Sequence, residues 1–255
     1  MSALRLVLHE FRYDQKVFWR NPSSVFFTAM LPVLFLVIFA TIFGRAEVGG
    51  LGIDTTTYYI PAIITLAVVS ATFVSLSMNV TIDREAGLLK RVRGTPLPAW
   101  VFIAGLVGNA FVISLVMLVV ITLVGRVFYA VPVPWEHLPA LIATLLVGAA
   151  SFCCLGLALS AAIPTREAAS AITNLISLPL YFLSGVFIPE SEIPDGVLTV
   201  AGFLPVRPFF QAFLAPWDPL TVGAGFEWGH LAVVAAWGVA GLLLAVRFFR
   251  WSPRS

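Results

Sequence analysis

The chain has 255 residues, of which 60% are hydrophobic and only 11% are charged, and its formal net charge is +2. Soluble proteins carry about 25% charged residues, so this composition excludes an ordinary soluble protein. Six apolar stretches of about 20 residues each would take up roughly half of the chain, which leaves little room for an appended globular unit. The sequence therefore predicts one all-α integral membrane domain over residues 1–255.

The first segment, residues 1–22, is expected to form an interfacial amphipathic helix that ends at Asn21-Pro22, because proline cannot continue the hydrogen-bond ladder. Basic residues recur at spacings of three and four and gather on one face, while apolar residues fill the opposite face. This pattern is typical of a helix that lies on a membrane surface. A helix that docks on a partner protein through its basic face fits equally well, and both roles can hold. The basic residues are Arg5, Arg12, Lys16 and Arg20.

Six apolar stretches follow, each close to or above the ~20 residues that cross a ~30 Å hydrocarbon core as a helix. Twelve of the fifteen Lys and Arg residues lie before the first stretch, between the second and third, between the fourth and fifth, and at the C-terminal end of the chain from Arg247 on. Because positive charge stays on the cytoplasmic side, both termini are expected to face the cytoplasm. The chain is expected to be a multi-pass protein of the plasma or inner membrane. The expected spans cover residues 25–43, 58–80, 99–124, 138–163, 168–188 and 229–249.

The connection between the second and third spans, residues 82–96, is short and dense in charge. Asp83 through Arg93 is expected to form about three helical turns that end at Gly94 and Pro96. A short amphipathic helix on a cytoplasmic rim suits a groove on another protein, although an ordinary solvated loop that obeys the positive-inside rule is an open alternative. The apolar side of this helix would consist of Leu88, Leu89 and Val92.

The connection between the fifth and sixth spans is the longest, and it contains two apolar runs, Val197–Leu204 and Phe209–Leu214. Neither run is long enough to span a bilayer, so residues 189–214 are expected to form short re-entrant or outer helices. Such helices would either cap a pathway between subunits or anchor the rim. Aromatic residues near the expected outer boundaries fit an interfacial belt: Tyr58, Tyr59, Tyr129, Trp135, Trp217 and Trp228.

No motif for chemistry is found. The sequence lacks G-x-x-x-x-G-K-[ST], H-E-x-x-H and G-x-S-x-G, so the chain is not expected to be an enzyme or to hydrolyse a nucleotide by itself. No metal site is expected, because no Cys, His or carboxylate cluster has ligand spacing, and Cys153 and Cys154 are interpreted as small packing residues.

The expected spans contain no carboxylate, which argues against a proton- or sodium-coupled transporter. Apart from His230 and Arg247, each near the end of a span, the polar residues within them are neutral, and such residues more often bridge helices than bind a ligand. As pathway candidates we single out Asn79, Asn174, Ser177, Tyr181 and Ser184.

Two motifs resemble those of ABC-2-type exporter permeases, the transmembrane subunits of a superfamily of drug, lipid and polysaccharide exporters. Arg84-Glu-Ala-Gly-Leu-Leu-Lys-Arg-Val-Arg-Gly-Thr-Pro96 is similar to the family's E-x-G…TP loop after the second span. Leu183-Ser-Gly-Val-Phe-Ile-Pro189, followed by Ile193-Pro194 and Leu204-Pro205, is similar to its sGvf-P…lP…lP region. The six-span layout and the amphipathic N-terminus also match, so the resemblance covers nearly the whole chain.

The resemblance implies an ATP-driven ABC exporter of a prokaryotic cell membrane. Two permeases, identical or paired with a sister permease, would enclose a pathway lined by spans 1, 2 and 5. Two copies of a separate ABC ATPase would bind ATP and Mg and dock underneath, and neither cofactor would bind this chain. The cargo would be hydrophobic or amphipathic: a drug, a lipid or a glycan-lipid. Membrane lipid is an expected partner and nucleic acid is not.

The resemblance also implies roles for individual residues. Contacts that couple the permease to the ATPase would involve Asp83, Arg84, Glu85, Leu88, Lys90 and Arg91. The outer re-entrant region would be marked by Pro189, Pro194 and Pro205. A self-contained secondary transporter or channel is the alternative function, and a structural membrane subunit that anchors a partner is a third.

Overall fold

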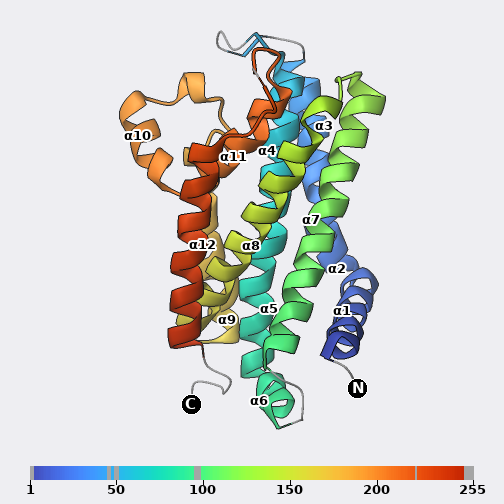
Figure 1. Ribbon diagram of the computed structural model, residues 1–255, viewed down its shortest axis with the longest axis vertical. Coiled ribbons are helices and arrows are strands. Elements are labelled where there is room, and N and C mark those ends of the chain that lie inside the picture. The colour runs from blue at the N-terminus through green and yellow to red at the C-terminus, as the bar shows by residue number, and fades with distance from the viewer. Residues whose placement is uncertain (1–2, 45–46, 49–51, 95–98, 222, 250–255) are drawn as a thin grey trace.

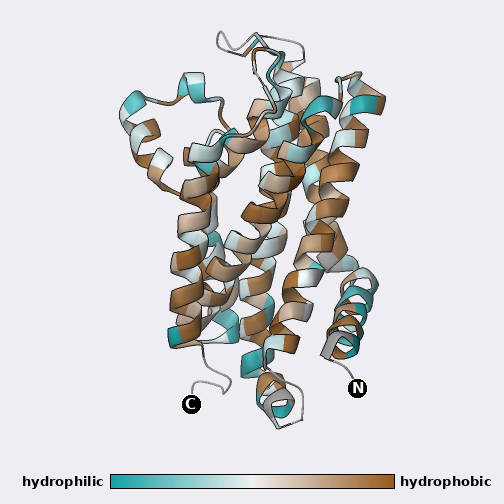
Figure 2. Ribbon diagram, in the orientation of Figure 1, coloured by the Kyte–Doolittle hydropathy of each residue, from teal (hydrophilic) through white to brown (hydrophobic). Residues whose placement is uncertain are grey.

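The computed structural model describes residues 3–44, 47–48, 52–94, 99–221 and 223–249, and within them the chain is helical and contains no strand. The helices run along one long axis, and α1 begins at the same end of the bundle at which α12 finishes (Figure 1). Hydrophobic residues dominate the long helices, whereas hydrophilic residues gather toward the two ends of the bundle and along α1 (Figure 2). This distribution is the one that a multi-pass membrane protein needs.

The N-terminal segment forms the helix α1 (Ala3–Arg20), and its predicted end at Asn21 is confirmed, although the short helix α2 (Pro22–Val25) follows at once. The predicted basic face is exposed in full: Arg5, Arg12, Lys16 and Arg20. Its opposite side packs on the lower half of α7 (Ala99–Tyr129), beside which it lies in Figure 1. That α1 lies on a membrane surface stays a prediction.

Four helices are long and apolar enough to cross a membrane within the part of the chain that the structure describes. They are Thr55–Glu85, Trp100–Tyr129, Trp135–Ala162 and Trp228–Phe248. The first is built from α4 (Thr55–Val69), a π-helical turn (Ser70–Val74) and α5 (Ser75–Glu85), the third contains α8 (Leu138–Ala162), and the last is α12 (Trp228–Phe248). These helices match the expected second, third, fourth and sixth spans.

The two other expected spans are helical but shorter. The first consists of a π-helical turn (Phe26–Met30) and α3 (Leu31–Phe43), which together give an apolar helix over Thr28–Phe43. The fifth is α9 (Arg166–Leu183), which ends five residues before the expected boundary because the chain turns at Gly185 with a φ of +87°. The count of six spans therefore remains a prediction.

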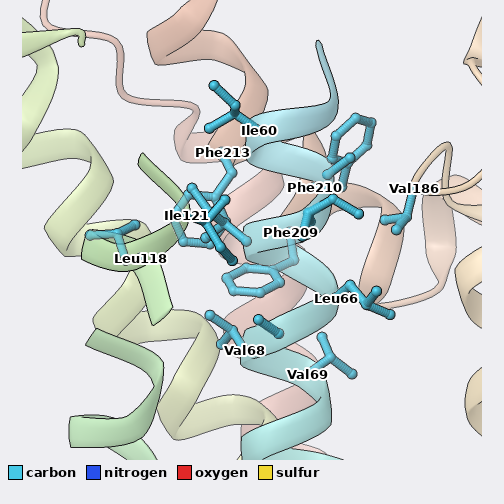
Figure 3. Close-up of a cluster of buried hydrophobic side chains, with 14 of the residues drawn as sticks. Ile60, Leu66, Val68, Val69, Leu118, Ile121, Val186, Phe209, Phe210 and Phe213 are labelled. Atoms are coloured by element: carbon cyan, nitrogen blue, oxygen red, sulfur yellow. The ribbon is translucent and has the colours of Figure 1, made fainter. Parts of the chain in front are cut away.

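The helix α4 is the centre of the bundle, since every one of its residues is buried. Figure 3 shows its side chains meeting Leu118 and Ile121 of α7 and the aromatic rings of α11 (Val206–Leu214). The ring of Phe209 lies so close to Gly148 of α8 that a Cβ there would overlap it. The core is therefore assembled from helices that are far apart in the sequence.

Two short helices stand at the end of the bundle opposite to α6, as predicted for the long fifth connection (Figure 1). These are α10 (Asp195–Phe203) and α11, which continues through the 3-10 turn Ala215–Trp217. They meet at an angle of 98° around Leu204-Pro205. This geometry is either a broken span or a re-entrant loop.

One expectation about the second connection is wrong. Asp83 to Arg93 does not form one helix, because α5 continues to Glu85 and α6 (Leu88–Arg93) begins after a break. The break is at Gly87, whose φ of +73° is a left-handed conformation that glycine adopts readily. The predicted end at Gly94 is confirmed, since its N–H bonds to Lys90 and Arg91, whereas Pro96 lies outside the described residues.

Candidate coupling and pathway surfaces

The short helix α6 forms a tip that projects beyond the other helices (Figure 1). Leu89 is fully buried in a cluster with Leu76, Val80 and Ala110, and this contact anchors the tip to α5 and α7. Leu88 is 44% exposed, and Lys90 and Arg91 are exposed as well. Leu88 and Leu89 therefore do not share the apolar side that we expected. We call the exposed residues Leu88, Lys90 and Arg91 the α6 tip.

Arg84 is not on this exposed surface. Its side chain is only 2% exposed, and its guanidinium donates hydrogen bonds to the carbonyl oxygens of Ser160 at 2.8 Å and Ile163 at 2.7 Å. A third bond, 2.8 Å long, joins its Nε to the carboxylate of Glu85. Because those carbonyls belong to the last turn of α8, where no helical donor is available, Arg84 caps α8. Sequence reasoning missed this role, and no pattern in the sequence around Arg84 indicates it.

The end of α5 also meets α1. The pKa of the Asp14 carboxyl is raised to about 7, mainly because burial disfavours its charged form and also because the carboxylates of Glu10 and Asp83 lie nearby. On the α7 side of this junction, Gly105 allows close approach, since a Cβ there would lie 3.0 Å from the Cβ of Glu10. The N-terminal helix and the second connection are thus brought together at the end of the bundle that carries α6.

A hydrogen bond joins α1 to α7 one turn after Gly105 on α7. The side-chain amide of Gln15 donates to the Oδ1 of Asn109 over 2.9 Å. Phe11 packs against α7 at Gly108, where a Cβ would lie 3.4 Å from its ring. α1 is seated on α7 in this way, at the end of the bundle where α6 also lies (Figure 1).

The polar residues expected to line a pathway fall into two groups. Ser177, Tyr181 and Ser184 are buried. Tyr181 and Ser70 share a hydrogen bond of 3.2 Å, and Ser184 donates to the carbonyl of Tyr181. Tyr181 therefore joins α9 to the centre of the bundle and Ser184 stabilises the end of α9, whereas Ser177 lines an apolar cavity between α8 and α9.

Asn79 and Asn174 form the second group, and both are exposed. They lie on α5 and α9, which a contact of 3.3 Å between the hydroxyls of Ser77 and Thr173 holds in register. Among the described residues neither amide has a hydrogen-bond partner. At ~1.5 Å per residue, Asn79 stands about 9 Å from the C-terminal end of α5 and Asn174 about 12 Å from the N-terminal end of α9. We call this exposed side of α5 and α9 the α5–α9 face.

The turn that follows α9 is held by α4. Tyr58 donates a hydrogen bond of 2.8 Å to the carbonyl of Gly185, and Tyr59 donates one of 3.2 Å to that of Phe187. Both tyrosines are buried, so their assignment to an interfacial aromatic belt is wrong, as is that of Trp217. Trp135 and Trp228 are exposed and remain candidates for such a belt.

An ion pair ties the turn Glu190–Glu192 to α11. Glu190 accepts two hydrogen bonds from Arg207, 2.9 and 2.8 Å long, and one from Gln211. Arg207 also donates to the carbonyl of Leu198 in α10. The prolines that mark this region differ in environment: Pro205 is buried, Pro189 is partly buried and Pro194 is exposed.

The family model described as ABC-2 type transporter matches residues 6–216, which is most of the chain. The chain belongs to the ABC-2 type transporter family. It is 22% identical to the putative transport permease YvfS of Bacillus subtilis over 233 residues, which are 91% of this chain and 92% of YvfS. It is 24% identical to the inner membrane transport permease YadH of Escherichia coli over 213 residues, 81% of this chain and 76% of YadH.

A third relative is the probable multidrug ABC transporter permease YbhR of Escherichia coli. The identity is 22% over 157 residues, which are 62% of this chain and 42% of YbhR. The chain is therefore a multi-pass membrane permease of the ABC-2 family, the transport subunit rather than the catalytic ATPase. In this permease, the described residues contain no group of three or more His, Cys, Asp or Glu that would hold a metal ion.

Proposed function

We propose that this ABC-2 permease is the transmembrane subunit of an ATP-driven exporter. Two permeases, identical or paired with a sister permease, enclose the pathway, and two copies of a separate ABC ATPase bind ATP and Mg beneath them. The observation that carries the proposal is the α6 tip, an exposed apolar residue flanked by two exposed bases at the end of the bundle where α1 also lies. A solvated loop has no need of such an anchored, projecting helix.

The α6 tip suits a groove with an apolar floor and acidic walls. Leu88 would be buried by the partner, while Lys90 and Arg91 would pair with its carboxylates. Glu85 and Asp83 would act at the edge of this contact, and the basic face of α1 would extend it. Arg84 makes a different contribution, because it links the tip to α8 rather than touching the ATPase.

The α5–α9 face supports the pairing of two permeases. An amide that faces hydrocarbon without a partner costs several kcal/mol, so Asn79 and Asn174 would be unfavourable on a surface covered by lipid. A second permease across this face provides polar partners or a hydrated pathway. Large apolar residues, among them Leu175 and Leu178, are exposed on α9 as well, and this mixture suits an amphipathic cargo such as a drug, a lipid or a glycan-lipid.

The driving force in this proposal is a difference in affinity. ATP draws the two ATPases together, and their movement is transmitted through the α6 tip to α5 and, by way of Arg84, to α8. A partner shifts the equilibrium between inward-open and outward-open permeases only as far as it binds one state more tightly than the other. ATP binding and hydrolysis supply that difference.

Disruption of the α6 tip tests the proposal. Leu88→Asp should reduce the amount of ATPase that copurifies with tagged permease by at least tenfold, because loss of a central buried contact at an interface costs about 2 kcal/mol or more. The measurement is Mg-dependent ATP hydrolysis in material purified from the native host membrane. Glu136→Lys, a charge change at an exposed site in the turn between the end of α7 and the start of α8, should leave copurification unchanged.

Two results would overturn the proposed function. One is wild-type material without any copurifying ATPase. The other is uphill solute transport by the permease alone, reconstituted in vesicles with an ion gradient, which would establish the alternative of a secondary transporter.

The orientation is open to a separate test. In a background with Cys153 and Cys154 replaced by alanine, Asp195→Cys should react with an impermeant thiol reagent added to intact cells, and Lys90→Cys should react only after the cells are opened. Both positions are exposed, so burial does not limit either reaction. The reverse pattern would place the termini outside and contradict an ATPase at the α6 tip.

A further inference from the structure

Two apolar cavities adjoin each other on the side of the bundle formed by α8 and α12. The first, of about 430 Å³, lies toward the inner end. The second, of about 220 Å³, extends between α8 and α9 to the bend between α10 and α11. Phe73 and Leu155 line both, so the cavities form one groove along much of the bundle. We call it the α8–α12 groove.

The lining of this groove explains why it stays open. On α8 the inner part is formed by the small side chains of Ala158, Ala161 and Ala162, which do not fill the space beside Leu244 and Phe248 of α12. Further out, Gly238 and Gly241 draw α12 onto α8, with only 2.4 to 2.8 Å between a Cβ at either glycine and the nearest atom of α8. The two helices are therefore in backbone contact at Gly238 and Gly241 and separate toward Leu244 and Phe248.

The groove is too apolar for water. A buried water needs two to four polar partners, and among the residues that line the second cavity Ser177 alone has a side-chain hydroxyl. An empty groove would also forfeit the dispersion contacts of its walls. In a membrane, the acyl chains of lipids can fill the groove.

The inner mouth of the groove is basic. The guanidinium of Arg247 lies 5.7 Å from the ring centre of Phe248, which lines the groove, and Arg247 is exposed. Arg166 begins α9 only four residues after Ala162, and it is exposed as well. Neither arginine has an ion pair among the described residues, and Glu167 is the acidic neighbour of Arg166. The positive end of the α9 dipole adds to the attraction for an anion here.

We propose that the α8–α12 groove binds an anionic phospholipid of the inner leaflet, with one acyl chain in the groove and the phosphate at Arg247 and Arg166. Basic pockets between membrane helices on the cytoplasmic side suit anionic head groups. A second copy of this chain fits less well, because a two-fold contact through this face would bring its basic mouth toward the same mouth of the partner. The inference uses the inward orientation of the α6 end but does not depend on ATP-driven export.

Lipid retention by the purified permease tests the proposal. The permease, without ATPase, is mixed in detergent with phosphatidylglycerol or phosphatidylethanolamine of identical acyl chains, and bound lipid is counted by native mass spectrometry. Phosphatidylglycerol should be retained about tenfold better than phosphatidylethanolamine. The pair Arg166→Gln with Arg247→Gln should abolish this preference, since each base near an anionic surface adds about tenfold or less. Arg126→Gln, at an exposed base in the last turn of α7, is the matched control.

A second variant separates the acyl chain from the head group. Ala158→Phe fills the inner part of the groove and should reduce retention of both lipids, while size-exclusion profiles report that the permease is still folded. Equal retention of the two lipids by the wild type, or retention unaffected by Ala158→Phe, would overturn the proposal. So would a dimer that Ala158→Phe converts to monomer, because the groove would then be an interface between copies. These results are independent of the ATPase test, which uses no added lipid.

Discussion

Replacing Arg84 with leucine should destabilise the permease by about 2–5 kcal/mol, the range expected when one partner of a buried, hydrogen-bonded charge network is removed. The change leaves the carbonyls of Ser160 and Ile163 without their donor in a buried setting, and it leaves the Glu85 carboxylate, 16% exposed, without its base. Thermal unfolding in detergent measures the effect as a lower Tm. Transport should fail together with folding of the inner end.

Arg84→Lys and Arg91→Leu complete this test. Lysine keeps the charge but has one ammonium group in place of a planar fork, so it cannot reproduce the bonds to α8 and Glu85 together and should recover only part of the lost Tm. Arg91 is an exposed base seven residues away on the α6 tip, and its loss should leave the Tm within the small change typical of surface sites. If Arg84→Leu unfolds at the same temperature as Arg91→Leu, Arg84 does not cap α8.

The apolar pattern was sufficient to predict most of the long helices. The expected span over residues 99–124 lies within α7. The expected span over 138–163 is one residue longer than α8 at its C-terminal end, and that over 229–249 is shifted by one residue from α12. The length of an apolar run is a local property, and a bilayer sets how long that run must be. The two helices at the bend around Pro205 were predictable for the same reason, because short runs and a proline are visible in the sequence.

The directions of side chains were not predictable, because they depend on distant segments. Arg84 was assigned to a docking surface, yet its partners lie 76 and 79 residues further along the chain. Tyr58 was assigned to a membrane boundary, yet it bonds to Gly185, 127 residues away. The polar pathway candidates divided in the same way: Asn79 and Asn174 are exposed, whereas Tyr181 is buried against Ser70. One-dimensional spacing cannot separate these cases.

Gly241→Ala should weaken the packing of α12 on α8. A Cβ at this position would lie 2.8 Å from the backbone nitrogen of Leu155 and 3.0 Å from the carbonyl carbon of Cys154. Backbone atoms cannot rotate away, so α12 must move off α8, at a cost of about 1–3 kcal/mol for an overpacked contact. Thermal unfolding should show the loss even though alanine is the better helix former by ~1 kcal/mol.

Gly229→Ala is the matched control for this prediction, since it adds the same methyl group to the same helix. No atom lies within 4 Å of a Cβ at Gly229, so this variant should unfold at the wild-type temperature or slightly above it. A difference between the two variants isolates the contact between helices from helix propensity. Equal unfolding temperatures would mean that α8 and α12 are not packed backbone to backbone, and the α8–α12 groove would then lose the contact that closes its outer part.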